Sequence, residues 1–290
     1  MNSTEMSTLL SAILVKKGMY AVEAETVAAR MVDADRIGRP IDGALSILKA
    51  VRSIDLGDID PRAIAMTISE TAASAYLDAN EGMGHVPASK AVHLAVQKAE
   101  IEGIAMTVIR NSQSLGSPLV YSGLMAEAGK IGFCLSNIPE ARDESGGFPS
   151  GASNGLQPAA CAFPTENCLA GIDLGFGHNL DSFFALSGEL SSVLGVFHTI
   201  LTSGLTGGLT PQQKTRGPLR ERFEHTLIAI NPERFAGRKK YLNLTHELAG
   251  AFQHSTSEQG LRRISMEIEF DYPAETIEEV TKLASSIKAI

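Results

Sequence analysis

The 290-residue chain lacks the simplest signatures of nucleotide-binding and metal enzymes. It has no G-x-G-x-x-G after an apolar run and no G-x-x-x-x-G-K-[ST], and His246-Glu247 is not followed by the second histidine of H-E-x-x-H. The seven histidines show no spacing that would place two or three of them around one ion. We therefore expect no metal site and a structural or surface role for each histidine. His198, beside an apolar helical stripe, should be partly buried with a backbone partner.

Positive charge, cysteine and long apolar runs are also scarce. The net charge of -8 disfavours a nucleic-acid or anionic-membrane partner, because phosphate binding needs clustered Lys and Arg. Cys134, Cys161 and Cys168 lie in apolar runs without paired spacing, which suits a reducing compartment. The apolar stretch around Leu190 to Leu205 is interrupted by polar residues, and the N-terminus lacks a secretory pattern. We expect a cytoplasmic protein that binds neither nucleic acid nor membrane.

Apolar periodicity predicts two regions that differ in their secondary structure. Helical spacing over residues 6–14, 24–32 and 41–51 predicts an N-terminal helical segment over 1–60. Helical and strand patterns are interspersed over 61–290, and hairpin-like strand pairs beside βα alternation favour an α/β fold with a mixed sheet. The expected strands are 63–68, 73–77, 104–109, 131–136, 159–163, 168–174, 226–230 and 264–270. The expected helices are 88–99, 120–127, 190–201, 240–252 and one from about Glu275.

The longest segment without a periodic pattern runs from Asn137 to Gln157 and is rich in Gly, Ser and Pro. A loop of this length in a compact domain is usually functional, so we expect it to form a cleft wall. Within it, Gly151-Ala152-Ser153-Asn154-Gly155 matches the G-x-S-x-G turn of α/β-hydrolases. A polar loop precedes the match and a strand pattern follows, whereas that turn joins a strand to a helix, and this context disfavours hydrolysis.

Several segments, in matching order and separation from about residue 5 to 285, resemble motifs of the non-Rossmann malate/L-lactate dehydrogenase family. This family includes sulfolactate and ureidoglycolate dehydrogenases, diketogulonate reductase and cyclic ketimine reductases. The segments are Ala34-Asp35-Arg36-Ile37-Gly38 with Asp42-Gly43 beside A-D-x-x-G-H-D-S-H-G; Arg110-Asn111-Ser112 with Gly116 beside R-N-S-x-H-F-G; Tyr121 to Asn137 beside Y-x-x-x-A-x-x-x-G-x-I-G-x-x-x-x-N; Gly155-Leu156-Gln157-Pro158 and Phe163-Pro164-Thr165 beside G-T-N-P and I-P-T; and Ile172-Asp173-Leu174 beside L-D-M.

The resemblance implies a non-Rossmann α/β fold, NADPH or NADH as the cofactor, a homodimer, and a small 2-oxo acid or cyclic imine acid as substrate. It places the cofactor-binding region at about 110–215. The implied cofactor-binding residues are Ser112, Gly116, Gly155, Pro158 and Asp173.

The family's proton donor is a histidine held by a neighbouring serine, and this pair is Ile41-Asp42 here. An aspartate could replace the histidine only if burial raised its pKa from about 4 to near neutrality. The arginine that clamps the substrate carboxylate falls on Ser46, and a second family histidine falls on Ser114. Asp42 and Ser114 are therefore the candidate catalytic residues.

The cofactor motifs are substituted as well. The small hydroxyl residues after Asp173 become Phe176 and Gly177, and Ser187-Gly188-Glu189-Leu190 replaces the lysine-bearing G-G-x-K-G turn. A stretch of several dozen residues between these two motifs is missing relative to the family.

Three functions remain open from the sequence. The first is a divergent NAD(P)H-dependent oxidoreductase with Asp42 or Ser114 delivering the proton. The second is a repurposed non-redox enzyme, such as a lyase, isomerase or cyclase, that uses Asp42 as acid or base. The third is a non-catalytic family member that binds a metabolite or a related subunit.

Overall fold

The computed structural model describes residues 1–137, 158–173, 195–211, 213–214, 222–251 and 261–289. Its helices are α1 (Ser3–Lys16), α2 (Ala21–Arg36), α3 (Ser46–Asp55), α4 (His85–Glu102), α5 (Pro118–Glu127), α8 (Arg238–Ala251) and α9 (Ala274–Ser286), with 3-10 turns η1 (Pro40–Asp42) and η3 (Pro232–Arg234) and the π-helical turn η2 (Ile200–Gly204). Its strands are β1 (Met66–Glu70), β2 (Ser74–Asp78), β3 (Ile104–Ser112), β4 (Ile131–Asn137), β5 (Ala159–Pro164), β6 (Leu169–Asp173), β7 (Phe223–Ile230) and β8 (Leu261–Ile264).

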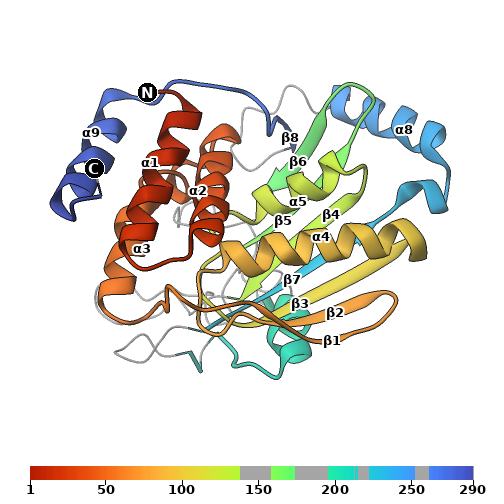
Figure 1. Cartoon of the computed structure of the whole chain (residues 1–290). Coiled ribbons are helices and arrows are strands. Elements are labelled where there is room, and N and C mark those ends of the chain that lie inside the picture. The colour runs from red at the N-terminus through yellow and green to blue at the C-terminus, as the bar shows by residue number, and fades with distance from the viewer. Residues whose placement is uncertain (138–157, 174–194, 212, 215–221, 252–260, 290) are drawn as a thin grey trace.

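The strands of the described chain form one sheet in the order β1-β2-β3-β7-β4-β5-β6-β8 (Figure 1). Neighbours β2 and β3 run parallel, and the other neighbouring pairs run antiparallel. The predicted α/β fold with a mixed sheet is therefore confirmed. No helix among the described residues combines the length and apolar character needed to cross a bilayer.

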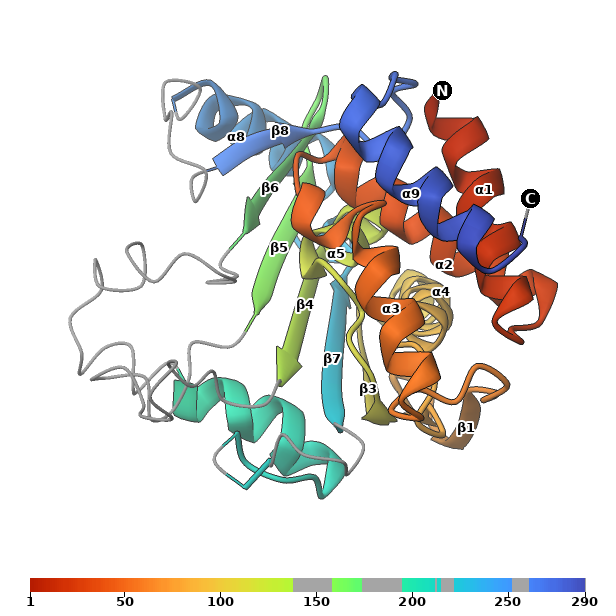
Figure 2. The same cartoon turned by 90° about the vertical axis from the view of Figure 1, so that its left-hand side faces the viewer.

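Helices α1 to α4 and α9 lie on the same side of the sheet (Figure 2). One apolar cluster fills the space between the sheet and helices α4 and α5, with Leu119, Tyr121 and Met125 of α5 fully buried. A second cluster joins α1, α2 and α3 to α9. The N-terminal helices therefore share their core with the C-terminal helix, so the helical layer is built from both ends of the chain.

The end of the sheet near the C-terminus differs from the sequence prediction. The pattern over 264–270 predicts a strand, but β8 ends at Ile264 after pairing with β6. The chain then leaves the sheet, because its polar groups bond to the first two helices instead. Arg36 Nε donates to the carbonyl of Ile268 at 3.0 Å, and the backbone N–H of Tyr272 donates to the carbonyl of Met1 at 3.0 Å.

Smaller differences lie at other element boundaries. Strand β1 begins at Met66, three residues later than the apolar pattern predicts. The helix expected over 190–201 is described only from residue 195 and continues through the π-helical turn η2. The remaining predicted strands and helices in the described ranges appear with boundary shifts of a few residues.

Gly132 of β4 allows α5 to lie against the sheet. A Cβ at this position would stand 2.7 Å from both the Cβ of Met125 and the carbonyl oxygen of Ser122, so the helix would have to move. We expect Gly132→Ala to lower the free energy of unfolding by about 1–3 kcal/mol, measured by urea denaturation. Gly204→Ala is the control, since its Cβ would meet nothing closer than 3.7 Å. Equal stability of Gly132→Ala and the unmodified chain would contradict this packing.

Candidate active site

Three of the predicted cofactor-binding positions, Ser112, Pro158 and Asp173, lie at one end of the sheet, where β3, β4 and β6 end and β5 and β7 begin (Figure 2). Ser112 is the last residue of β3 and is paired with the first residue of β7. Asp173 is the last residue of β6 and is paired with the second residue of β5. The carbonyl of Pro158 accepts a hydrogen bond from the backbone N–H of Ser136 at 2.9 Å. Positions that are far apart in the sequence thus lie along the same end of the sheet.

The turn that carries Asp42 is held by Asp35. The carboxylate of Asp35 accepts the backbone N–H of Ala44 and the hydroxyl of Tyr272, both at 2.7 Å. A Cβ on Gly43 would stand 1.9 Å from an oxygen of Asp35, so only glycine fits there. Burial raises the pKa of Asp35, and these hydrogen bonds oppose that effect.

The same turn corrects a helix prediction. Apolar periodicity predicts a helix over 41–51, but residues 40–42 form the 3-10 turn η1 and α3 begins at Ser46. The hydrogen bond from Ala44 to Asp35 directs the chain away from a continuous helix. Asp42 therefore projects from a short turn rather than from the first turn of a helix.

Arg39 connects the two acidic residues that the sequence singles out. Its guanidinium lies 3.1 Å from Asp173 Oδ2 through Nε and 3.6 Å from Asp42 Oδ2 through a terminal nitrogen. The contact with Asp173 is electrostatic, because Nε of Arg39 makes no hydrogen bond within the described chain. Asp173 is 3% exposed and the side chain of Arg39 is 18% exposed, so the pair is buried on the side of Asp173. Arg39 was not among the sequence-predicted site residues, although a charged residue between Gly38 and Pro40 could have indicated it.

Gly116 lies between Asp42 and a buried histidine. Its φ of +76° is a conformation that favours glycine. A Cβ at Gly116 would stand 3.1 Å from Nε2 of His85 and 3.8 Å from the Cβ of Asp42. The absence of a side chain thus allows His85 and the turn of Asp42 to pack closely against Gly116. His85 was not among the sequence-predicted site residues, and its position directly after Gly82-Met83-Gly84 was the only available signal.

The two predicted serines have different surroundings. Ser114 is exposed, and its hydroxyl accepts the backbone N–H of Gly116 at 3.2 Å. Ser112 is fully buried, and its hydroxyl donates to the carbonyl of Gln113 at 2.9 Å. A contact between Ser112 and a cofactor would therefore use its main chain.

His225 joins the ends of β3 and β4. Its Nε2 lies 3.0 Å from the hydroxyl of Ser112 and 3.1 Å from the carbonyl of Gln113, and its Nδ1 lies 2.8 Å from the hydroxyl of Ser136. A carbonyl only accepts hydrogen bonds, so we assign the ring proton to Nε2, and the hydroxyl of Ser136 then donates to Nδ1. His198 bonds to the carbonyl of Ser136 at 3.1 Å, which confirms its predicted buried position and backbone partner.

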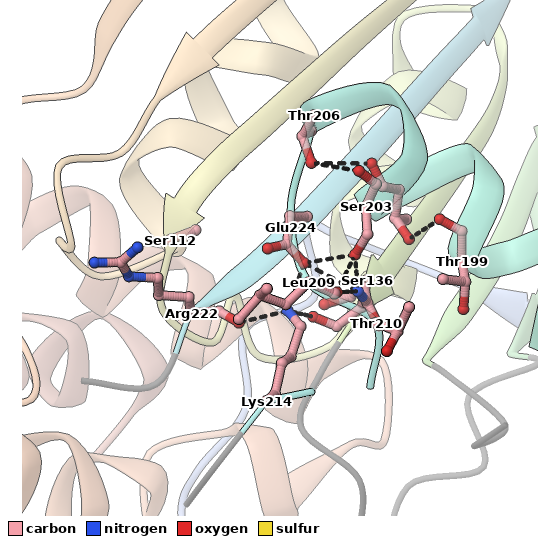
Figure 3. Close-up of polar contacts among 12 residues, drawn as sticks. Ser112, Ser136, Thr199, Ser203, Thr206, Leu209, Thr210, Lys214, Arg222 and Glu224 are labelled. Atoms are coloured by element: carbon pink, nitrogen blue, oxygen red, sulfur yellow. Dashed lines mark hydrogen bonds and ion pairs between the residues drawn. The ribbon is translucent and has the colours of Figure 1, made fainter. Parts of the chain in front are cut away.

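A buried ion pair lies beside this chain of hydrogen bonds (Figure 3). Lys214 is paired with Glu224, and both side chains are less than 5% exposed. The ammonium of Lys214 also donates to the carbonyls of Asn137, at 3.2 Å, and of Arg222. Ser203, in η2, donates to the same Glu224 oxygen at 3.0 Å. The three N–H donors of Lys214 are therefore all used within the protein, and the cluster attaches η2 to the end of the sheet.

Several predicted features lie outside the described residues. These are Gly155, the 137–157 loop beyond its first residue, the G-x-S-x-G match, Phe176, Gly177 and the segment 187–190. In the part of the chain that the structure describes, no three His, Cys, Asp or Glu residues gather where they could hold a metal ion.

Acid should destabilise the protein through its buried histidines. Burial lowers the pKa of His85 and His225 to about 3 and that of His198 to about 4. Histidines of the unfolded chain take up protons near pH 6.5, whereas these three do not do so until much lower pH. Their contribution to stability is therefore fully present above pH 6.5 and is lost progressively as the pH falls towards 4.

We expect the free energy of unfolding from urea titrations to fall between pH 7 and pH 5, by up to roughly 1.4 kcal/mol per pH unit for each histidine. His198→Gln should make this dependence shallower. The same slope in both proteins would count against a neutral, buried His198.

Comparison with known proteins identifies the family. The malate/L-lactate dehydrogenase family profile matches residues 1–174. Over 298 aligned residues the chain is 26% identical to L-sulfolactate dehydrogenase of Methanocaldococcus jannaschii, covering 87% of this chain and 83% of that enzyme. The structure of malate dehydrogenase from Pyrococcus horikoshii matches with a TM-score of 0.78 at 21% identity, covering 98% of this chain and 94% of the other.

The structure of delta1-piperideine-2-carboxylate reductase from Pseudomonas syringae matches with a TM-score of 0.77 at 21% identity, covering 97% of this chain and 98% of the other. These structural likenesses establish the expected non-Rossmann fold. Because the family profile matches more than half of the chain, the protein belongs to the malate/L-lactate dehydrogenase family of oxidoreductases.

Proposed function

We propose that this protein is an NAD(P)H-dependent oxidoreductase for a small 2-oxo acid, imine or related metabolite, with Asp42 at the proton-handling position. The observation that carries the proposal is the approach of Asp42 and Asp173 to one guanidinium, that of Arg39, at the end of the sheet. Each of the two acidic residues was selected from a different family motif, and their meeting in space supports a common site.

Arg39 supports an anionic substrate. The family's substrate-binding arginine is replaced by Ser46, yet Arg39 places a positive charge next to Asp42 and keeps 18% of its side chain exposed. The relatives are named for malate, sulfolactate and piperideine-2-carboxylate, all of which carry an acid group. We assign to Arg39 the attraction of such a group.

The described residues fit a nicotinamide cofactor. NAD(P)H, when bound, supplies a hydride to the carbonyl or imine carbon. Gly116 keeps its segment close to the turn of Asp42, and Ser112 and Pro158 lie at strand ends of the same end of the sheet. Asp173 is buried and contacts the guanidinium of Arg39. This contact would fix the position of the guanidinium next to the ligand.

Asp42 would handle the proton that accompanies the hydride. In the reductive direction, the substrate carbon gains the hydride, and a protonated Asp42 gives its proton to the oxygen or nitrogen and is left as a carboxylate. In the oxidative direction, the ionised carboxylate of Asp42 accepts that proton from the hydroxyl or amine. Arg39 places a positive charge 3.6 Å from the carboxylate of Asp42, and this geometry supports a role for Asp42 in proton transfer.

The same carboxylate favours a second candidate function. A carboxylate held beside an arginine suits the removal of a proton from carbon next to a carboxylate, as in a lyase or isomerase. This reaction would use the same residues without a nicotinamide cofactor. For either function we propose a cytoplasmic homodimer that binds a small molecule, as the family resemblance implies.

Asp42→Asn tests the assignment. Purified protein is first titrated with NADPH and NADH by fluorescence, and turnover is then measured with a panel of 2-oxo acids, cyclic imine acids and 2-hydroxy acids. We expect cofactor binding, and we expect Asp42→Asn to lower kcat by roughly 10²–10⁴-fold while cofactor affinity is retained, since acid–base groups contribute about that much. Asp55→Asn, at an exposed ion pair with Lys17, is the matched control and should keep full turnover.

The same experiment separates the two candidate functions. Absence of binding and turnover with both cofactors would exclude the oxidoreductase. In that case, Asp42-dependent incorporation of deuterium from D2O into a carboxylic acid would support the second function. Unchanged kcat in Asp42→Asn would exclude Asp42 from either role.

A further inference from the structure

The helical segment over residues 195–206 turns its apolar side chains to solvent and its polar side chains to the protein. It lies at the end of the sheet, apart from helices α1 to α4 and α9 (Figure 2). Four of its apolar side chains, which we call the outer face, are between 47% and 62% exposed: Val196, Phe197, Ile200 and Leu205. Its buried side chains are polar: His198, Thr202, Ser203 and Thr206. A helix of a globular protein normally places its apolar stripe against the core, so this segment is inverted.

Hydrogen bonds fix the helix in this orientation (Figure 3). Ser203 donates to the carboxylate of Glu224 at 3.0 Å, beside the buried pair of Glu224 with Lys214. From the sheet, Tyr76 donates its hydroxyl to the carbonyl of Thr206 at 2.7 Å. Turning the apolar side chains inwards would break these bonds, and buried polar groups that lose their partners are costly. The outer face therefore stays exposed in a single chain, and an exposed apolar patch of this kind marks an interaction surface.

The absence of charge around the outer face indicates which partner fits it. The sequence has no Asp, Glu, Lys or Arg from Leu190 to Gln213, and the next charged residue, Lys214, is paired inside the protein. The whole chain carries a net charge of -8, so two copies repel each other over most of their surfaces. Like charges that meet across an interface are unfavourable. An uncharged apolar segment is therefore the surface at which two copies of this acidic chain can approach.

The shape of the outer face also suits contact with itself. Two large side chains, Phe197 and Ile200, are followed along the chain by exposed glycines at 204 and 207. A Cβ on Gly204 would meet nothing closer than 3.7 Å, and one on Gly207 would meet nothing within 4 Å. In a two-fold contact the same patch is used by both copies, and antiparallel helices would place the large side chains of one against the glycines of the other.

We propose that the outer face is a self-association surface, on which a second copy of this chain packs its own 195–206 helix about a two-fold axis near Ile200. This contact removes both apolar faces from water and brings no charge against a like charge. The inference rests on the homodimer of the proposed function and adds the surface that forms it. It uses no residue assigned to catalysis, so it can be tested separately from turnover.

Opposite charges introduced at Ile200 test the contact. Analytical ultracentrifugation gives the dissociation constant of the dimer for the unmodified protein, Ile200→Glu and Ile200→Lys. We expect each variant alone to raise this constant by at least about 100-fold, because like charges then face each other across the axis. A 1:1 mixture of the two variants should recover most of the dimer. Leu244→Glu is the matched control, since Leu244 on α8 is 57% exposed and Ile200 is 55% exposed, and it should leave the constant unchanged.

A second variant removes apolar surface without adding charge. Phe197→Ser shortens the most exposed side chain of the outer face, and we expect it to raise the dissociation constant by at least about tenfold through lost apolar burial. Circular dichroism of all variants at a concentration where the dimer is dissociated should match that of the unmodified chain, because Ile200 and Phe197 make few contacts within one copy. If the charged variants do not fold, the result with Phe197→Ser decides the test.

The outcomes distinguish this inference from the proposed function. An unchanged dissociation constant in Ile200→Glu and Phe197→Ser would overturn this surface and leave the homodimer in place. Weakening by both charged variants without recovery in their mixture would overturn the two-fold contact. A monomeric unmodified protein would overturn both the surface and the homodimer, and Phe197-dependent sedimentation with phosphatidylcholine vesicles would then assign the outer face to a bilayer. Cofactor binding and turnover test the oxidoreductase assignment independently of these results.

Discussion

The guanidinium of Arg39 sits between two carboxylates that come from opposite parts of the fold. Asp42 belongs to the turn after α2, in the helical layer, and Asp173 ends a strand of the sheet. Asp173 is buried, so loss of its partner Arg39 would leave a buried charge without compensation. The contact between Arg39 and Asp173 therefore fixes the helical layer against the end of the sheet, and it determines where Asp42 lies relative to the strands.

Close backbone contacts complete this arrangement. Gly43 is pressed against Asp35, Gly84 against Gln113, and Gly116 against His85. At each position a Cβ would collide with or crowd a polar group, so glycine is what allows the turn to approach.

The polar groups around this end of the sheet fall into two kinds. The hydrogen bonds of His225, and those that surround Lys214 and Glu224, connect β3, β4, β7 and η2 in closed networks. Hydrogen-bonded networks of this kind rigidify the structure around them. A second kind has a buried atom without a hydrogen-bond partner in the described chain, as at Nδ1 of His85 and Oδ1 of Asn137.

Apolar periodicity was sufficient to predict the order of the elements and the mixed sheet, because strands such as β3 and β4 bury alternate residues. It failed over 264–270, where polar groups of the segment bond to α1 and α2 after β8 ends, which is a tertiary effect. Family motifs located Asp42 and Asp173 but not Arg39 or His85. The contribution of these two residues depends on a contact across the fold, which spacing along the chain does not encode.

The most direct test of this account is a double-mutant cycle on Arg39 and Asp173. The free energy of unfolding is measured for Arg39→Gln, Asp173→Asn, the double variant and the unmodified chain. The account predicts that the two substitutions are coupled by about 1–3 kcal/mol, as expected for side chains in direct contact. Additive effects of the two substitutions would contradict the claim that this ion pair assembles the site.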